Sequence, residues 1–394
     1  MWQQQQPREG LERRKKKKKM LQSKNFWVCC VVCDHQRSIM HMLNHGCVEG
    51  KHVVIQDYLN LKHKGTIKTI KSEDGDVIDC VDIYKQPAFD HPLIKDLQME
   101  PSSSPIGMKM DDSQPKLIQN WHKNGECPQG TIPIRRTQNR DLHRTFPFRR
   151  QGGQHYHPFG QAPGAHEYAF VTETGSTYYG AHAAFNVWNP KTEANEFSLS
   201  QIWVMSDKAT LNTIEAGWMG DNYQSTGCYD LTCPGFVQTS HKFALGSTIK
   251  PVSTYNGKIF AISMLIYKDN NTGNWWLQVQ DVVFGYWPGS IFTGLADSAT
   301  IVSWGGEIIN LGSAQHHTTT QMGSGHFPFE GYGKSSFFNS LKVIDDSNTQ
   351  QDPASLQPYV TNSACYDLQI GENTSSDAGT YFLYGGPGYS AECP

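Results

Sequence analysis

Hydrophobic and polar residues alternate in short runs through most of the chain beyond residue 166, and turn-forming residues separate the runs. This two-residue period is typical of β-strands joined by tight turns. The runs with this character are 168–172, 181–187, 197–204, 212–218, 235–238, 259–267, 275–279, 301–309 and 381–384. Within this part of the chain, residues 290–299 are the stretch that favours a short helix. Many short strands at close spacing predict an all-β sandwich or barrel.

The first 150 residues are organised differently. A short helix is expected near 53–62, and residues 77–84 alternate like a strand after the Asp74-Gly75 turn signal. Residues 99–115 are rich in proline, serine and aspartate, which predicts a linker. We divide the chain into a basic N-terminal segment (1–50), a small mixed α/β pro-segment with a processing linker (51–150) and a main β domain (155–394).

Charge follows the same division. Residues 1–150 hold 26 of the 34 Lys+Arg and 17 of the 37 Asp+Glu, a balance of +9, and the remainder has a balance of −12. The pairs Arg135-Arg136 and Arg149-Arg150 are expected to be exposed to processing. We hypothesise that the leading part docks on the main domain, covers its cleft, and is released when acid weakens the contact. No nucleic-acid partner is expected.

The N-terminus has the residue order of a secretory signal. A basic stretch, 13–19, precedes an apolar run, 26–32, although the run is short and no clear cleavage site follows it. A nuclear-type basic tract and a mispredicted first exon are the alternatives. Asn270 and Asn373 begin N-glycosylation triplets. We expect a secreted or vacuolar protein with no transmembrane helix, since no run approaches eighteen apolar residues.

Six of the ten cysteines lie beyond residue 50: Cys80, Cys127, Cys228, Cys233, Cys365 and Cys393. Two lie in the pro-segment and four in the main domain, so each group can pair within its own segment, which favours an oxidising compartment. Zinc binding at the Cys228/Cys233 pair is the competing interpretation, but no second pair has ligand spacing. No metal or cofactor is expected.

Two glutamates interrupt apolar strand-like runs of the main domain. Glu215 and Glu307 each have small residues beside them, which allow another backbone to approach closely. Each also has a tryptophan three residues away, Trp218 or Trp304, which is expected to form an apolar wall that raises the carboxyl pKa. If both carboxylates face one groove, their like charges would push their pKa values apart, giving the acid and the base that hydrolysis needs.

Other interpretations of these residues stay open. A glutamate on the solvent face of a strand is the ordinary case, and the same pair would suit a retaining or inverting glycosidase. A carbohydrate-binding sandwich would use exposed aromatic residues, with Trp275, Trp276, Tyr286 and Trp287 as candidates. Five histidines are candidates for a metal site but have no ligand pattern; they are His155, His157, His316, His317 and His326.

Several long motifs resemble the plant neprosin family, from about residue 65 to the C-terminus. In the pro-segment they are K-T-I-K-S-E-D-G-D from Lys68 and C-P-Q-G-T-I-P-I-R-R from Cys127. In the main domain they are N-V-W-N-P from Asn186, N-T-I-E-A-G-W from Asn212, Y-Q-S-T-G-C from Tyr223, W-G-G-E from Trp304, M-G-S-G-H-F-P from Met322 and Y-G-G-P-G-Y from Tyr384. So many motifs in order make the resemblance specific.

The resemblance implies a glutamic endopeptidase with an antiparallel two-sheet β-sandwich, made as a zymogen and active in acid. Its catalytic glutamates fall on Glu215 and Glu307, its substrates are peptides or proteins, and its pro-segment acts as an inhibitor. By analogy with other glutamic peptidases, Glu307 is assigned as the general base and Glu215 as the protonated partner that polarises the scissile carbonyl. Cleavage after proline is a family preference that this chain is not required to share.

The family also implies disulfides Cys228–Cys233 and Cys365–Cys393, and Cys80 and Cys127 are then expected to pair in the pro-segment. Six residues are candidates for lining the substrate groove: Gln201, Trp203, Trp218, Tyr223, Trp287 and Trp304.

One departure from the family is visible. Only residues 219–222 connect the I-E-A-G-W motif to the Y-Q-S-T-G-C motif, where family members carry a longer stretch. A strand or hairpin beside Glu215 is therefore expected to be missing, leaving an open sheet edge and a catalytically impaired sandwich as the alternative to a working peptidase.

Overall fold

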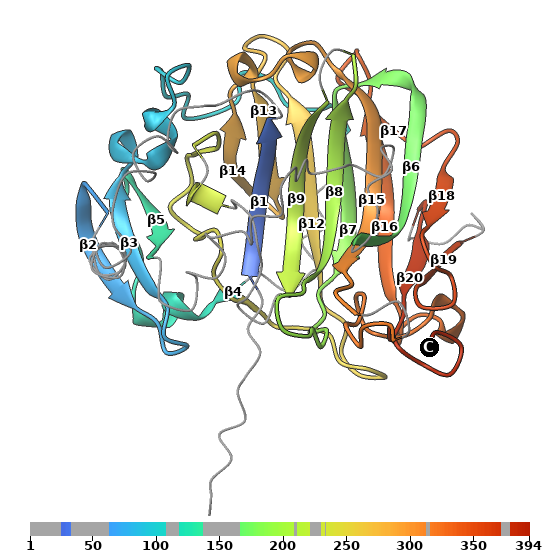
Figure 1. Cartoon of the computed structure of the whole chain (residues 1–394). Coiled ribbons are helices and arrows are strands. Elements are labelled where there is room, and N and C mark those ends of the chain that lie inside the picture. Colours follow the sequence, from blue (N-terminus) through green and yellow to red (C-terminus); the bar gives the residue numbers. More distant parts are fainter. Residues whose placement is uncertain are drawn as a thin grey trace, which may run out of the picture.

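The computed structural model describes residues 63–107, 118–136, 166–208, 211–220, 230–232, 234–312, 316–371 and 379–394, together with the backbone of residues 25–32. These residues form two large antiparallel sheets stacked face to face, with a smaller unit beside one edge (Figure 1). The predicted all-β sandwich is confirmed. In the described part of the chain, no helix has the length and apolar character needed to cross a membrane.

The first sheet has six strands in the order β1-β9-β8-β15-β6-β18. Their bounds are β1 (Asn25–Val32), β9 (Asn212–Gly220), β8 (Ser198–Ser206), β15 (Ala299–Ile309), β6 (His166–Tyr178) and β18 (Gln357–Val360). Nearly every residue of β8, β9 and β15 is buried, so both faces of the sheet centre are covered. That explains why these runs carry apolar residues at both strand parities.

The second sheet has nine strands, eight of them in the order β10-β14-β13-β12-β7-β16-β20-β19, with β17 paired to β16. Their bounds are β10 (Val237–Gln238), β14 (Val282–Trp287), β13 (Trp275–Val279), β12 (Ala261–Lys268), β7 (Gly180–Asn186), β16 (Ser336–Ile344), β20 (Phe382–Gly385), β19 (Asp367–Ile370) and β17 (Gln350–Gln351).

The core lies between the two sheets, where large aromatic residues from both meet. Trp218 and Trp304 of the first sheet are fully buried there, and the Trp218 indole donates a hydrogen bond of 3.0 Å to the Asn186 carbonyl of β7. The hydroxyls of Ser200 and Tyr384 also hydrogen-bond between β8 and β20. These polar links fix the stacking of one sheet on the other and leave the opposite face of the first sheet for other roles.

Strand β1 covers the edge that the short connection after Trp218 was expected to leave open. It runs antiparallel to β9 over eight residue pairs, from Asn25 opposite Met219 to Val32 opposite Asn212 (Figure 1). An unpaired edge strand offers backbone hydrogen-bonding groups to other chains, and pairing removes that hazard. The apolar N-terminal run therefore acts as an edge strand in this structure.

The pro-segment forms a three-stranded sheet, β2-β3-β5, and adds one short strand, β4, to β11 of the main domain. The bounds are β2 (Thr66–Lys71), β3 (Val77–Asp82), β5 (Thr131–Arg135), β4 (Ile118–Gln119) and β11 (Ile249–Lys250). The disulfide Cys80–Cys127 crosses this unit. The helix predicted at 53–62 lies outside the described residues.

Short 3-10 turns complete the described structure. They are η1 (Ile83–Lys85), η2 (Pro87–Asp90), η3 (Asn120–Asn124), η5 (Asp230–Thr232), η6 (Gly289–Ile291), η7 (Gly294–Ala296) and η8 (Pro328–Glu330). The helix predicted at 290–299 is wrong, because that stretch forms η6 and η7. The Asn212 side-chain oxygen accepts the backbone N–H groups of Thr293 and Gly294, which holds this stretch in turns rather than in a continuous helix.

The prediction that Arg135-Arg136 is exposed to processing is also wrong. Arg135 ends strand β5, and its guanidinium lies 3.5 Å from Asp76 with only 8% of its side chain exposed. Arg136 binds the fully buried Asp79 through two hydrogen bonds of 2.5 and 2.9 Å. Burial opposes the charge on Asp79, but His63, Arg136 and Thr69 together lower its pKa, so this pairing is fully present above the ordinary aspartate value of about 3.9. The other dibasic pair, Arg149-Arg150, lies outside the described residues.

Deleting residues 1–32 should destabilise the protein, because it exposes the edge of β9 beside Glu215. We expect a melting temperature lower by at least roughly 4 °C and concentration-dependent association in gel filtration, relative to the chain lacking only residues 1–24. Equal stability and equal monomer content of the two deletions would show that β1 does not contribute to the sheet.

Candidate active site

Glu215 and Glu307 lie on the same face of the six-stranded sheet, opposite to the core. On β9, Thr213, Glu215 and Met219 share this outer face, whereas Ile214, Ala216 and Trp218 join the core. On β15 the same alternation places Glu307 outside and Trp304 inside. Strand β8 runs between the two and contributes Gln201 and Trp203 to the outer face.

Between the two glutamates, the sheet surface is formed by Gln201 with a glycine on each neighbouring strand. In the register, Gly217 of β9, Gln201 of β8 and Gly305 of β15 stand in one row. A Cβ atom at Gly217 would lie 2.0 Å from the Ser200 carbonyl oxygen, and one at Gly305 would lie 2.4 Å from that of Ala169. Glycine is therefore required at both positions. In this row only Gln201 carries a side chain, and the charges of the two carboxylates interact across it; the two glutamates are two strands, or roughly 10 Å, apart laterally and one row to either side of it.

Glu215 is surrounded by neutral donors. Its Oε2 accepts a hydrogen bond of 3.1 Å from the Gln201 amide, and its Oε1 accepts one of 3.0 Å from the Thr213 hydroxyl. Desolvation, followed by the negative charge of Glu307, raises the pKa of Glu215 to about 7, against the opposing effect of those two hydrogen bonds and of His166. Glu215 is therefore a carboxylic acid over the acid range.

Glu307 has a cationic neighbour instead. His166, the first residue of β6, places Nδ1 2.5 Å from Glu307 Oε1. Tyr168 is the register partner of Glu307, and burial together with the nearby charge of Glu307 raises the pKa of its hydroxyl. Neither His166 nor Tyr168 was predicted. The motifs around Glu215 and Glu307 contain no histidine. The signal for His166 in the sequence was its two-residue spacing from Tyr168 and Phe170, which puts the three side chains on one face of the strand.

Aromatic residues of neighbouring strands extend this outer face. Phe170 of β6 stacks on Tyr359 of β18 with ring centroids 5.0 Å apart, and Trp203 of β8 lies 6.0 Å from Phe170. Trp203 is also the register partner of Glu215. Gln201 Oε1 is buried and has no hydrogen-bond partner among the described residues.

Of the six predicted groove residues, only Gln201 and Trp203 share the face of the glutamates. Trp218 and Trp304 are wrong as groove residues, because a side chain three positions along a strand lies on the opposite face. The same parity removes them as the apolar wall beside each carboxylate. Trp287 is also wrong, since it is fully buried in the second sheet. Tyr223 lies outside the described residues.

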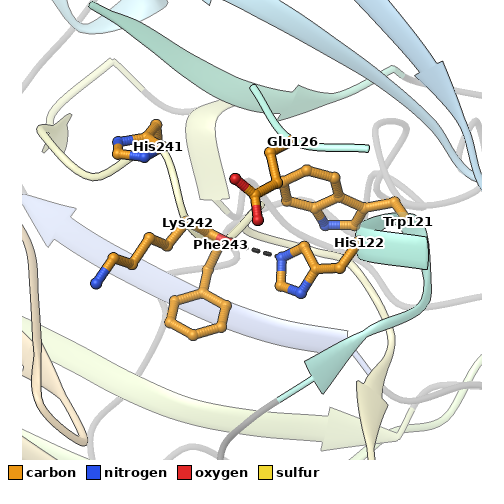
Figure 2. Close-up of a pocket in the computed structure, with 6 residues that line it drawn as sticks. All are labelled: Trp121, His122, Glu126, His241, Lys242 and Phe243. Carbon is orange, nitrogen blue, oxygen red and sulfur yellow. Dashed lines mark hydrogen bonds between the residues drawn. The ribbon is translucent and has the colours of Figure 1, made fainter. Parts of the chain in front are cut away.

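The aromatic residues proposed for carbohydrate binding are not exposed. Trp275, Trp276 and Tyr286 are 1% exposed or less and pack in the core of the sandwich. A hollow does occur where the pro-segment meets the main domain, and Figure 2 shows the six side chains that line it. His122 hydrogen-bonds there to the Lys242 carbonyl oxygen at 2.7 Å. Neither glutamate of the pair lines this hollow.

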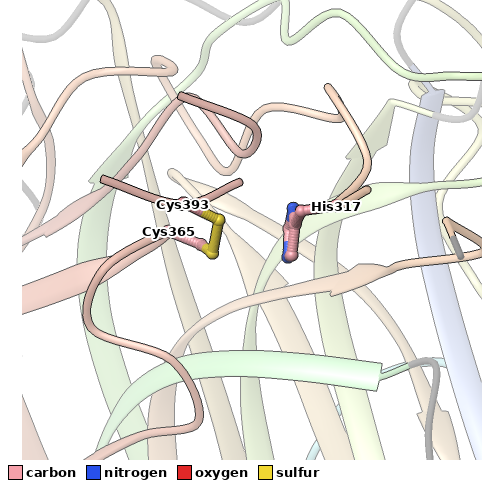
Figure 3. A group of neighbouring side chains, drawn as sticks. All are labelled: His317, Cys365 and Cys393. Atoms are coloured by element: carbon pink, nitrogen blue, oxygen red, sulfur yellow. A yellow bond between two sulfur atoms is a disulfide. The ribbon is translucent and has the colours of Figure 1, made fainter. Parts of the chain in front are cut away.

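Among the described residues, one group has the geometry to suggest a metal site: His317, Cys365 and Cys393 (Figure 3). The two cysteines form a disulfide, and both His317 ring nitrogens are engaged, with Glu167 at 2.9 Å and the Thr318 carbonyl at 2.8 Å. No ligand atom is left for a metal. The Cys228–Cys233 pair lies outside the described residues, as do His155 and His157.

The glycosylation candidates differ in what the structure describes. Asn270 is exposed in the turn after β12, which is accessible to modification, and its glycosylation stays a prediction. Asn373 lies outside the described residues. His316 stacks on Tyr389, and His326 pairs with Glu330 at 3.0 Å, so neither belongs to a metal cluster in the described structure.

Comparison with protein families matches both parts of the chain. A family model described as Neprosin matches residues 194–387, and one described as Neprosin activation peptide matches residues 69–181. The second match extends through β6, so a strand within the activation-peptide match lies in the sheet that carries both glutamates.

Two solved structures are weakly similar. One is SCP-B, a member of the Eqolisin family of peptidases, in complex with the tripeptide Ala-Ile-His; it is 13% identical, covers 56% of this chain and 98% of its own, and has a TM-score of 0.32. The other is Scytalido-glutamic peptidase with a peptide-based transition-state analogue, at 12% identity, 57% and 98% coverage, and a TM-score of 0.31. Function therefore has to be inferred from the residues of this chain.

Titration of Glu215 tests the geometry of the pair directly. We expect its carboxyl signal, followed by ¹³C NMR of glutamate-labelled protein, to titrate with a midpoint of about 7. Thr213→Val removes a hydrogen bond to the charged form and should raise the midpoint, whereas Glu307→Gln removes a like charge and should lower it. A midpoint near the ordinary glutamate value of about 4.3, unchanged in both variants, would contradict this arrangement.

Proposed function

Because the chain belongs to the neprosin family, we propose that it is an acid-acting glutamic endopeptidase, made as a zymogen, in which Glu215 and Glu307 activate water. One observation supports this most strongly: two carboxylates on one sheet face stand in different environments across a floor of glycine and glutamine. Such asymmetry separates an acid from a base.

In the proposed reaction Glu307 takes a proton from water while the water oxygen attacks the scissile carbonyl carbon. His166 lies against this carboxylate, and Tyr168 is its register partner. Glu215, neutral below a pH of about 7, donates a hydrogen bond to the carbonyl oxygen as charge develops there. These roles follow the charges of the neighbours: the carboxylate beside a cation acts as the base, and the one among neutral donors as the acid.

The substrate is proposed to be an extended peptide lying over the Gly217–Gln201–Gly305 row. Close approach of a substrate backbone is possible where side chains are absent. The unpaired Gln201 Oε1 would accept a substrate N–H, and the stacked rings of Phe170 and Tyr359 suit an apolar residue. A preference for cleavage after proline, whose ring is apolar and rigid, is part of the proposal.

The compartment is also proposed from the chemistry of the chain. The disulfides Cys80–Cys127 and Cys365–Cys393 favour an oxidising environment, and an acid-acting peptidase suits an extracellular or vacuolar location. No second function is proposed, because the aromatic residues that a carbohydrate-binding surface would require are in the core.

The pro-segment is proposed to keep the peptidase latent, but its described contacts lie on β10 and β14 of the second sheet, on β11 and on the loops beside them. The Gln86 side chain hydrogen-bonds to both backbone groups of Gln238 on β10, and that of Gln119 binds Ala244. These contacts are uncharged, so they do not depend on the charge difference between the two parts. The sequence led to the hypothesis that the pro-segment covers the cleft with the two glutamates. None of these described contacts lies at the glutamates.

One contact of the pro-segment is acid-sensitive. The predicted linker at 99–115 is docked in its described part. Ser102 and Ser103, with Gln98 just before the linker, donate hydrogen bonds of 2.7 to 3.2 Å to the fully buried Asp269 carboxylate. Burial opposes that charge, but the hydrogen bonds dominate and lower the pKa of Asp269. A lowered pKa means that this contact is fully present above the ordinary aspartate value of about 3.9 and weakens as the pH falls below it.

The peptidase proposal predicts cleavage of a proline-containing peptide by the acid-matured protein, with activity declining as the pH rises through about 7 because Glu215 loses its proton. Glu307→Gln and Glu215→Gln should each reduce kcat by about 100-fold or more. Glu330→Gln, a substitution of the same kind in the 326–330 turn, is the matched control. Retained activity in either variant of the pair would refute the dyad.

Asp269→Asn should loosen the pro-segment at neutral pH, since a charge-assisted anchor is replaced by a neutral one. We expect backbone amides of residues 98–103 in the full chain to exchange with deuterium roughly tenfold faster at pH 7, and the difference from wild type to shrink toward pH 3. Asp281→Asn, at an exposed turn between β13 and β14, is the control. Identical exchange in wild type and Asp269→Asn would exclude the anchor.

A further inference from the structure

His166 contacts Glu307, one glutamate of the pair, and it takes no direct part in the proposed reaction. Its Nδ1 lies 2.5 Å from Glu307 Oε1, and 40% of its side chain is exposed against 10% for Glu307. The imidazole therefore stands at the rim of the site, with the carboxylate behind it. This arrangement differs from a surface ion pair, in which both partners are free to separate.

The sheet holds the imidazole in place from two sides. Register pairs Glu307 with Tyr168 and Ile309 with His166, so His166 is the diagonal neighbour of Glu307 across β6 and β15. The imidazole stacks on Tyr168 at 6.3 Å and meets Phe197 edge-on at 6.0 Å. The contact is thus set by the strand pairing and the flanking rings.

The charged and titratable groups that face His166 come from four strands. Among the described residues they are Glu307 of β15, Glu215 of β9 and Tyr168 of β6, with Tyr359 of β18 behind Tyr168, and the facing residues of β8 are uncharged. Desolvation favours the neutral imidazole, but the hydrogen bond and charge of Glu307, with the charge of Glu215, raise the pKa of His166 above its ordinary value. Among these groups, His166 is the one that carries positive charge in acid.

We propose that His166, as an imidazolium, is a positioning residue that keeps the Glu307 carboxylate ionised and oriented to accept a proton from the attacking water. This inference rests on the proposed peptidase function. In the step, water gives its proton to Glu307 and its oxygen bonds to the carbonyl carbon, while the carbonyl oxygen is stabilised by Glu215. His166 neither gains nor loses a proton, so its role is electrostatic and geometric.

Two variants separate the charge of His166 from its hydrogen bond. His166→Asn places an amide N–H near the position of Nδ1 and removes the charge, whereas His166→Ala removes both. In full-length protein matured in acid, we expect the acid limb of the kcat–pH profile to move up by about one unit in both variants. At the optimum, kcat should fall by about tenfold or more in His166→Ala and less in His166→Asn, with KM little changed.

The chain contains a matched control. His326 pairs with Glu330 through the same atoms, Nδ1 and Oε1, at 3.0 Å, with 35% and 23% of the side chains exposed. His326→Gln removes a pair of the same kind outside the glutamate face and should leave the acid limb unchanged. An acid limb of His166→Asn that superimposes on wild type, or an equal shift in His326→Gln, would overturn the inference.

A measurement without catalysis separates this inference from the peptidase proposal. In ¹³C-histidine NMR of the full chain, the His166 signal is assigned by its loss in His166→Ala. Its titration midpoint should lie above the ordinary histidine value of about 6.5, and Glu307→Gln should lower that midpoint. If wild-type protein cleaves no peptide, the peptidase proposal fails. A His166 titration that is unaffected by Glu307→Gln overturns the pairing, whatever the activity.

Discussion

Two carboxylates on one partly buried sheet face are the constraint on which the site depends. Like charges in such a place repel each other, and desolvation penalises each of them further. The structure resolves this conflict by giving the two residues different neighbours. Glu215 has the Thr213 hydroxyl and the Gln201 amide, and its pKa rises to about 7, while Glu307 has the His166 imidazole and the Tyr168 hydroxyl. The same asymmetry that makes both residues tolerable also makes them chemically distinct.

That constraint extends into the strands that carry the pair. Because each glutamate stands on an outer face, its immediate neighbours, Ile214 and Ala216 or Gly306 and Ile308, must serve the core face. Gly217 and Gly305 then occupy the only row between the carboxylates, where a side chain would strike the neighbouring backbone. Gly217 and Gly305, each two positions from a glutamate in the sequence, therefore have two functions. They allow close strand packing, and they leave the positions on either side of Gln201 without side chains.

The sequence predicted the strands better than the site around them. Runs such as 275–279 and 301–309 match β13 and β15, because alternation and turn residues are local signals. The 3-residue spacing of Trp218 from Glu215 was misread, since strand parity sends the two side chains to opposite faces. His166 was missed because it is brought to Glu307 by the pairing of β6 with β15, over 141 residues of sequence. Strand β1 was missed because an apolar N-terminal run carries no local sign of its partner β9. Long-range pairing, rather than propensity, decided each of these errors.

Histidine, as the cation beside the two glutamates, is consistent with catalysis at acidic pH. Every arginine of the chain lies at or before Arg150, so lysine and histidine are the only cationic side chains of the main domain after that point. An arginine beside Glu307 would stay charged at any pH and would stabilise the carboxylate under all conditions. A histidine is charged only below its pKa, and the hydrogen bond and charge of Glu307 raise the pKa of His166 above its ordinary value, so the counter-charge for Glu307 is present in acid, where Glu215 is protonated. The acid Glu215 and the positioning cation His166 are then both protonated in acid, which ties the assembled site to acidic conditions.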